Sequence, residues 1–297
     1  MSGLFAVPRI EAFDALVPPD TKVAFHGVNK SGSLSMATTL RDAYAAAGRA
    51  DEFFGHYFKS GMPLADYLRD AEALPGHRFL VAHYLYGSLP PRPGRVLVTQ
   101  FRHPLPRLLS CYNWLKRTHE ARRASTTFPS IEQWALQSRG RRYSQVMQFG
   151  LGFAPNFLDR LERMTARDLY ENALDAIERD VFCFGIAERF EESIFLFAGL
   201  CRLPHVVPWV RDQRNPGRLH SSEVPPETRA VLEDVFRYDF ALYDRMLALF
   251  DQRLAGLDLG PDLEPYRRAC ESQYNDRILP ARAMRAPQAL SHARTPA

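Results

Sequence analysis

The sequence predicts an α/β fold in which helices flank a mainly parallel central sheet, and two observations support this prediction. Four short apolar runs, at 22–27, 79–86, 95–101 and 181–188, have the length and the aliphatic or aromatic content of buried strands. Patterns with helical spacing follow three of these runs. A strand that is repeatedly followed by a helix indicates parallel pairing, because parallel strands need a crossover connection.

The first run forms the clearest junction between a strand and a helix. KVAFHG (22–27) stops at VNKSG, a cluster of residues that favour turns. The segment 33–48 then places apolar residues at helical spacing, is rich in alanine and closes on Gly48, a residue well suited to the end of a helix. We therefore expect a tight turn between this strand and the helix that follows it.

The remaining elements are predicted from the same patterns. The run at 95–101 leads directly into a helix that begins at Pro104 and extends to about residue 117. An amphipathic segment from 190 to 203 follows the last apolar run, and a long helical stretch is predicted from 227 to 254.

Length and composition limit the class of protein. The 297 residues are 46% hydrophobic and suit a single α/β domain, which we place at 1–260, with a C-terminal extension at 261–297 that contains a mobile basic tail. The net charge of +4 is too mild for a general nucleic-acid binder. No apolar run is long enough for stable insertion into a membrane.

Three features of the sequence bear on where the protein resides. The N-terminus lacks a basic stretch followed by an apolar one, so we expect no secretion signal. The four cysteines form no CxxC pair and no zinc-like spacing with histidine, which is typical of reduced thiols in the cytoplasm. Only four of the 38 basic residues are lysines, a bias typical of GC-rich bacterial genomes. We therefore expect a cytoplasmic bacterial protein.

The first junction, FHGVNKSGSLSM (25–36), has the features of an anion site. A helix that directly follows a tight turn presents free N–H groups and the positive end of its dipole, which attract phosphate or sulfate. Gly32 lets the backbone approach such a ligand, and Lys30 adds a compact, movable charge. Hydroxyl donors are offered by Ser31, Ser33 and Ser35. An ordinary capped helix is the alternative, and this is not a Walker loop because the lysine precedes the glycine.

The second junction adds a residue suited to phosphate. In VLVTQFRHPLPRLLSCYNWL (96–115), Arg102 follows the end of the strand, and Ser110 lies eight residues later on the helix. A planar guanidinium binds phosphate through two parallel hydrogen bonds, and a hydroxyl adds a further donor. Taken alone, these residues are also compatible with a surface salt bridge and an ordinary helix serine.

Together, the two junctions resemble the sulfotransferases that depend on 3′-phosphoadenosine-5′-phosphosulfate (PAPS), particularly the branch that contains carbohydrate sulfotransferases. HGVNKSGSLSM resembles that family's 5′-phosphosulfate loop, and FRHPLPRLLSCYNW resembles its 3′-phosphate motif with the arginine-to-serine spacing kept. VAHYLYG (81–87) and FGIAERFEESIFLF (184–197) are weaker similarities. The similarity covers about residues 22–250. Leu34 stands where the family usually has Thr or Ser, and His103 stands where it usually has Asp.

The resemblance implies a P-loop-like three-layer sandwich and a defined reaction. A sulfuryl group would pass from PAPS, the co-substrate, to a hydroxyl of an acceptor, which we expect to be a carbohydrate or glycolipid. Lys30 would contact the sulfuryl group or the bridging oxygen and stabilise the leaving bisphosphate. Arg102 and Ser110 would bind the 3′-phosphate, which ATP lacks. No metal is required if fixed cations and amides stabilise the developing charge.

The acceptor hydroxyl needs a general base, and the sequence offers three candidates. His83 is the first, because it lies near the same sheet edge and histidine titrates near neutral pH; a purely structural histidine is the alternative. His56 and Glu52 are the reserve candidates, since related sulfotransferases also use a glutamate from this region. We also expect Tyr143 and Gln145 to line the acceptor cleft, with core packing as the alternative for the tyrosine.

Two other functions stay open at this point. The second enzyme hypothesis is a phosphotransferase that uses a nucleoside triphosphate, although neither a Walker lysine nor a metal-binding carboxylate after a strand is evident. The third hypothesis is a non-catalytic module that binds a polyanion through its arginines. The latter predicts affinity that falls steeply with salt.

Overall fold

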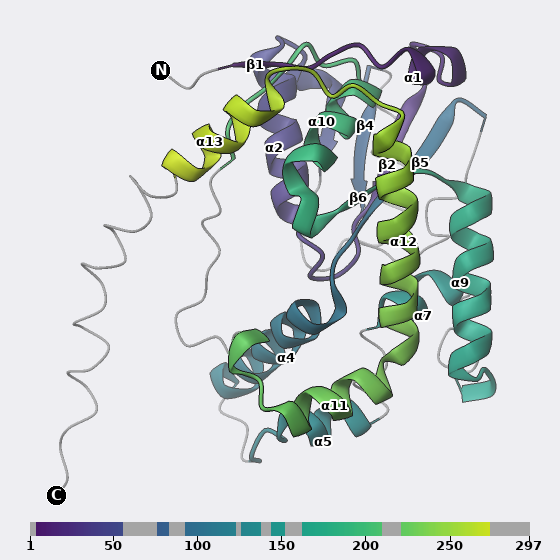
Figure 1. Cartoon of the computed structure of the whole chain (residues 1–297), viewed down its shortest axis with the longest axis vertical. Coiled ribbons are helices and arrows are strands. Elements are labelled where there is room, and N and C mark those ends of the chain that lie inside the picture. Colours follow the sequence, from purple (N-terminus) through teal and green to yellow (C-terminus); the bar gives the residue numbers. More distant parts are fainter. Residues whose placement is uncertain are drawn as a thin grey trace, which may run out of the picture.

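A computed structural model of the chain describes residues 4–55, 76–82, 93–122, 126–137, 144–151, 162–209 and 221–273. Within these ranges the strands of the central sheet are β2 (Lys22–His26), β3 (Phe53–Gly55), β4 (Phe79–Ala82), β5 (Arg95–Phe101) and β6 (Val181–Ile186). They are all parallel and lie in the order β3-β4-β2-β5-β6 (Figure 1). The expected α/β fold with a parallel central sheet is confirmed.

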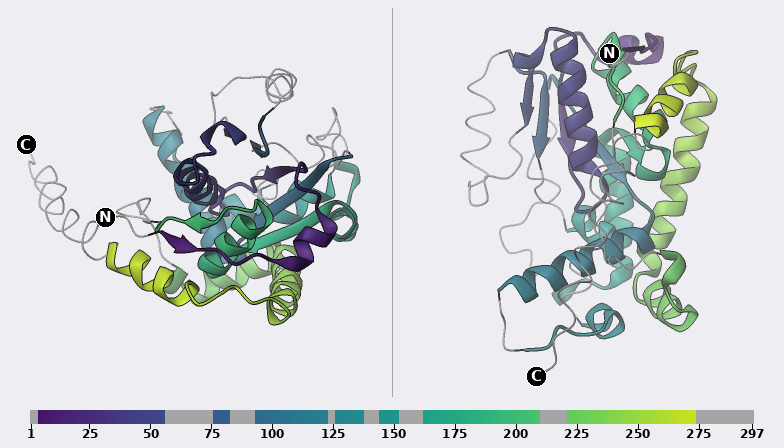
Figure 2. Two further views of the ribbon diagram at one scale, coloured as in Figure 1. Left: turned by 90° about the horizontal axis from the view of Figure 1, so that it is seen from above. Right: turned by 90° about the vertical axis from the view of Figure 1, so that its left-hand side faces the viewer.

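Helices cover both faces of this sheet, as the two views in Figure 2 show. One face carries α2 (Ser33–Ala46) and α10 (Phe190–Leu200). The other carries α7 (Gln145–Gly150), α9 (Ala166–Asp180) and α12 (Arg237–Ala255). Phe25 packs against Phe197 of α10 with ring centroids 5.9 Å apart, and Phe101 packs against Phe149 of α7 at 5.3 Å. The three layers therefore share one main hydrophobic core.

A second, smaller core lies beyond the carboxyl ends of the strands (Figure 1). Its helices are α4 (Pro104–Ala121), α5 (Ile131–Leu136) and α11 (Pro226–Val235). In this core Trp134 stacks on Phe236 with ring centroids 6.2 Å apart. The helical stretch predicted from 227 to 254 is present but divided, because α11 and α12 meet at Phe236. Phe236 is buried in the small core, while α12 packs on the sheet. The apolar spacing in the sequence therefore continues across the break between the two helices.

Elements near the two ends of the described chain, together with β7, pack against the main core. These are β1 (Phe5–Ala6), α1 (Glu11–Leu16), β7 (His205–Val206), which pairs with β1, and α13 (Leu263–Gln273). Tyr266 of α13 contacts Phe5 and Phe195 with ring centroids 5.5 and 5.4 Å apart. The core thus continues past the domain boundary expected at 260. The expected basic tail lies beyond residue 273, outside the described residues.

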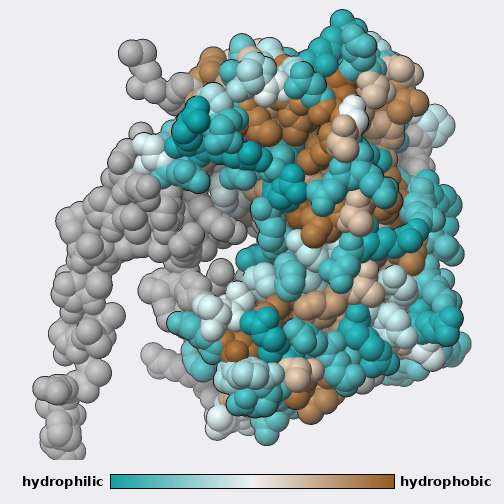
Figure 3. Space-filling model, in the orientation of Figure 1, coloured by the Kyte–Doolittle hydropathy of each residue, from teal (hydrophilic) through white to brown (hydrophobic). Residues whose placement is uncertain are grey.

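The sequence led us to expect no membrane-spanning segment and reduced cysteines. On the face that Figure 3 presents, hydrophilic and apolar residues are interspersed. No helix in the described ranges is long and apolar enough to cross a membrane. All four cysteines are buried as free thiols, which agrees with the absence of paired spacing in the sequence.

Candidate functional site

The loop between β2 and α2 has an unusual backbone. Lys30 has a φ of 63° and Gly32 a φ of 87°, so both lie in the left-handed region. Such a conformation costs a non-glycine residue roughly 1–3 kcal/mol and persists only where the surroundings impose it, often at ligand sites. Gly32 serves as the N-cap of α2, and its missing side chain makes that conformation accessible.

The N-terminus of α2 keeps its positive character. No side chain caps it, and its first turn contains no acidic residue. The first backbone bond of the helix runs from Met36 N to Gly32 O at 3.1 Å, so the N–H groups before Met36 have no partner within the helix. The side chain of Leu34 is exposed beside them. This end of the helix is therefore suited to a bound anion.

The three serines of the loop differ in their surroundings. Ser31 and Ser33 are buried, and their hydroxyls donate to the carbonyl of Val28 at 2.9 and 3.0 Å. These two hydroxyls hold the loop together in the structure. Ser35 is half-buried, and its carbonyl accepts from Thr39 Oγ1. The role of all three serines as donors to a ligand stays a prediction.

Arg102 connects the two junctions. It follows the end of β5, which pairs directly with β2, and its Nη1 atom donates to the carbonyl of Lys30 at 3.0 Å. Its backbone is held by Gln145, whose Oε1 accepts from Arg102 N at 3.0 Å and whose Nε2 donates to Arg102 O at 2.9 Å. The expected proximity of Lys30 and Arg102 is thus present. Gln145 is fully buried in this contact, and its expected place in the acceptor cleft stays a prediction.

A buried ion pair connects the segments that form the two junctions. Arg107 and Asp239 are fully buried, and Arg107 Nη2 lies 3.1 Å from Asp239 Oδ2. Arg107 Nη1 donates to the carbonyl of Asn29 at 3.1 Å, while Asp239 accepts from the backbone N–H of Gln145 and Val146, each at 2.9 Å. The pair therefore links the β2–α2 loop to α4, α7 and α12. A second link runs from Asn29 N to Gln148 Oε1 at 3.1 Å.

The side chain of Lys30 lies along α4. Its Nζ atom is 4.9 Å from the centroid of the Trp114 ring. Burial lowers the pKa of Lys30, and the positive charges of Arg117 and Arg102 lower it as well. Among the described residues no carboxylate pairs with this ammonium. Ser110 is half-buried one helical turn before Trp114, so it lies on the same side of α4.

A cavity of about 400 Å³ opens beside Arg102 at the start of α4. Its lining includes His103, Glu188, Arg229 and the serines at 221 and 222. Glu188 accepts from the backbone N–H of His103 at 3.1 Å and from the hydroxyl of Tyr243 at 3.0 Å. His103 Nδ1 in turn accepts from Leu105 N and caps α4. His103 therefore supports the start of α4.

Of the three candidates for the general base, only Glu52 lies in the part of the chain that the structure describes. His83 and His56, and also Tyr143, lie outside the described residues. Glu52 precedes β3 and so lies at the amino edge of the sheet, opposite the carboxyl edge where Arg102 meets Lys30. There Glu52 pairs with Arg49 at 2.6 Å, which lowers the pKa of Glu52. The expectation that Glu52 is a reserve base is therefore wrong.

Sequence reasoning missed the residues that support the site. Arg107 and Asp239 form the buried pair, and Gln148 binds the loop before α2, whereas Gln145 was expected at the acceptor cleft and holds the backbone of Arg102. One signal was present in the sequence: two glutamines three residues apart interrupt the apolar stretch of α7, and such polar residues in a buried helix need partners. The partners themselves are far apart in the chain and are visible only in three dimensions.

Comparisons with known proteins add little to this geometry. No family model matches the sequence, and no curated protein matches it. Among solved structures, a sulfotransferase from Alicyclobacillus acidocaldarius is 17% identical to this chain, with 77% of this chain and 96% of that chain covered and a TM-score of 0.38. A likeness with so low a TM-score carries no argument, so function has to be inferred from this chain's own residues.

Proposed function

We propose that this chain is a sulfotransferase that moves a sulfuryl group from PAPS to a hydroxyl of an acceptor, a carbohydrate or glycolipid. The observation that carries the proposal is the 3.0 Å hydrogen bond from Arg102 Nη1 to the carbonyl of Lys30. This bond holds cationic residues from two adjacent strand ends at one site. A nucleotide with anionic groups at both its 3′ and 5′ positions matches such a pair.

The 5′-phosphosulfate is assigned to the loop before α2. The free N–H groups and positive end of α2 attract an anion, and no acidic residue in the first turn opposes it. The ammonium of Lys30, whose pKa is lowered by burial, gains a counter-charge when the anion binds. The contact with the nearby Trp114 ring stabilises the ammonium only in part, so a bound anion adds further favourable free energy.

The 3′-phosphate is assigned to Arg102 and Ser110. The guanidinium of Arg102 is largely buried, and its Nε atom lies 3.9 Å from Glu188 Oε1, which is beyond hydrogen-bond distance. The assignment follows from chemistry, because a planar guanidinium matches a phosphate through two parallel hydrogen bonds. A cavity of about 400 Å³, lined by His103 and Glu188 among others, opens next along the chain and is within the size range of small-molecule sites.

In the proposed transfer, the acceptor oxygen forms a bond to sulfur while the bond from sulfur to the bridging 5′-phosphate oxygen breaks. That oxygen leaves with the electron pair as part of 3′,5′-adenosine bisphosphate. Lys30 stabilises the charge that develops there. His83, which follows β4 in the sequence, is assigned as the base that takes the acceptor's proton. Substitution His83→Ala should abolish turnover with bisphosphate binding nearly intact, and near-normal turnover would remove His83 from this role.

Ligand titration tests the proposal directly. We expect 3′,5′-adenosine bisphosphate to raise the melting temperature and to bind in calorimetry, and ATP to do so much more weakly. Equal responses to the two nucleotides would favour a phosphotransferase. Affinity for any polyanion that falls steeply with salt, with no preference for a 3′-phosphate, would favour the non-catalytic module.

A further inference from the structure

Gln100, the penultimate residue of β5, has a buried side chain whose polar atoms are unsatisfied. The residue is fully buried. Neither its Nε2 nor its Oε1 atom has a hydrogen-bond partner among the described residues. Native proteins satisfy nearly all such buried groups, and an exception indicates a bound water, an ion or a functional role.

The carboxamide of Gln100 lies next to Gly32, the N-cap residue of α2. In the sheet Gln100 pairs with Gly185, which packs against α10, so both residues face the layer that contains α2 and α10. A β-carbon added to Gly32 would lie 3.7 Å from Gln100 Nε2 and 3.9 Å from the β-carbon of Ala187. The amide is therefore within van der Waals distance of the residue that begins the helix.

The surroundings favour an anion as the missing partner. The N-terminus of α2 has no side-chain cap, and no acidic residue lies in its first turn. No carboxylate in the described part of the chain pairs with Lys30. An apolar side chain at position 100 would suit the core and avoid the cost of a buried amide without partners. The Nε2 donor of Gln100 on β5 thus lies beside the uncapped N-terminus of α2, and no described residue supplies an acceptor to that amide.

We propose that Gln100 is a ligand-binding residue of this site, and that its Nε2 atom donates a hydrogen bond to a phosphate or sulfate oxygen held at the N-terminus of α2. The identification of that anion as the 5′-phosphosulfate of PAPS rests on the proposed function, whereas the binding of an anion by Gln100 does not. Neither the strand pattern nor the family resemblance indicates this residue.

The test compares wild type with Gln100→Met, which keeps a similar volume and removes both polar atoms. Calorimetry with adenosine 5′-monophosphate and 3′,5′-adenosine bisphosphate should show affinities about tenfold lower for the variant, because one hydrogen bond to a charged acceptor is lost. Affinity for adenosine 3′-monophosphate should not change. The unliganded variant should melt at the same or a higher temperature than wild type. Gln137→Met, on the exposed end of α5, is the matched control and should change none of these values.

Three outcomes distinguish the possibilities. Unchanged affinity for both 5′-phosphate ligands, with a lower melting temperature, would mean that Gln100 holds a buried water only and would overturn the inference. If Gln100→Met does not fold, Gln100→Leu provides the same comparison. If wild type binds none of the nucleotides but binds inorganic sulfate, and the Gln100 variant loses that affinity, the inference stands while the proposed function fails.

Discussion

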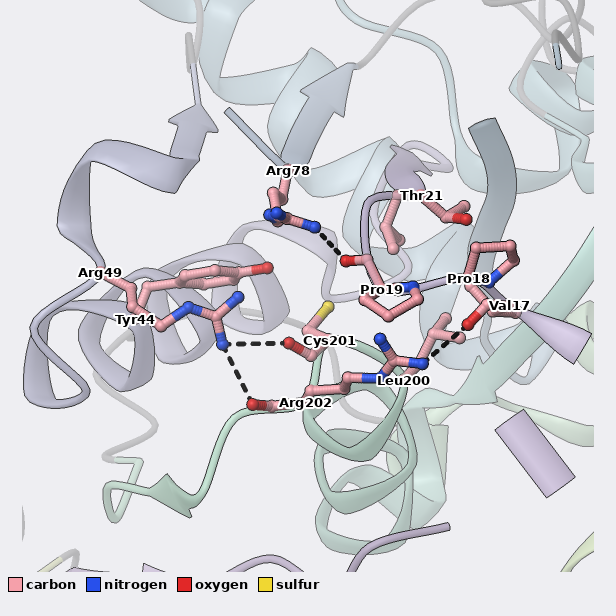
Figure 4. A pocket seen from close by; sticks show the side chains of 11 residues that line it. Val17, Pro18, Pro19, Thr21, Tyr44, Arg49, Arg78, Leu200, Cys201 and Arg202 are labelled. Carbon is pink, nitrogen blue, oxygen red and sulfur yellow. Dashed lines mark hydrogen bonds between the residues drawn. The ribbon is translucent and has the colours of Figure 1, made fainter. Parts of the chain in front are cut away.

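The two edges of the central sheet both gather basic side chains but differ in how their charges are matched. At the amino edge, Arg49 pairs with Glu52 at 2.6 Å and Arg202 pairs with Asp14 at 2.8 Å. Arg49 also donates to the carbonyl of Arg202, and Arg78 donates to the carbonyl of Pro19 (Figure 4). These arginines enclose a cavity of only about 30 Å³, large enough for about one water molecule.

At the carboxyl edge the ammonium of Lys30 has no carboxylate partner among the described residues. The ammonium of Lys30 contacts an aromatic ring, and the nearest carboxylate oxygen of Glu188 lies 3.9 Å from Arg102 Nε. The N-terminus of α2 has no side-chain cap, and a cavity of about 400 Å³ opens at the start of α4, lined by His103 and Glu188 among others. The two edges thus differ in that the arginines at the amino edge pair with carboxylates, whereas the ammonium of Lys30 at the carboxyl edge has no carboxylate partner among the described residues.

The largest expected effect concerns the support of the carboxyl edge. Asp239→Ala leaves Arg107 buried without its carboxylate and should lower the free energy of unfolding by about 3–5 kcal/mol. Glu52→Ala at the amino edge removes a partly exposed pair and should cost about 1 kcal/mol or less. Denaturant unfolding measures both values, and equal costs for the two variants would contradict the contrast between the edges.

The next effect separates binding charges from structural ones. Lys30→Met should lower turnover by about 10²–10³-fold, because it removes a cation at the developing charge. Lys22→Met changes a lysine at the opposite end of β2, beside His77, and should leave turnover unchanged. Turnover is measured with PAPS and a sugar acceptor. A Lys30 variant with the turnover of the Lys22 variant would remove Lys30 from the reaction.

The smallest effect is a pH dependence at the start of α4. Burial lowers the pKa of His103 below its ordinary value near 6.5, although the Glu188 carboxylate opposes this shift. The unfolded chain therefore binds a proton that the folded protein excludes, and stability falls as the pH drops below about 6.5 toward the folded pKa. His103→Asn keeps a side chain suited to capping and should lose less stability than wild type between pH 7 and 5. An equal loss of unfolding free energy between pH 7 and 5 in the two proteins would contradict this assignment.

The strands and the two junctions could be predicted from the sequence because their signals are local. Apolar runs specified β2, β4, β5 and β6, and turn residues followed by helical spacing placed Lys30 and Arg102 at strand ends. Parallel strands then bring such ends to one edge, so the proximity of the two residues followed from the topology.

The parts that were missed depend on contacts between distant segments. With three residues, β3 is too short to give a periodic signal in the sequence. The helix breaks at Phe236 because that residue is buried in the small core together with residues of α4 and α5. The pairing of Arg107 with Asp239 joins residues 132 positions apart. Glu52 was misplaced because its position before or after a short strand decides which edge of the sheet it occupies.

The most direct test of the central claim is a calorimetric comparison of wild type, Lys30→Met and Arg102→Met with 3′,5′-adenosine bisphosphate and the two adenosine monophosphates. The account predicts that Arg102→Met loses the affinity contributed by the 3′-phosphate and keeps that of the 5′-phosphate, and that Lys30→Met shows the reverse. Equal loss of affinity for all three ligands in both variants would contradict it, because the two strand ends would then not bind opposite ends of one nucleotide.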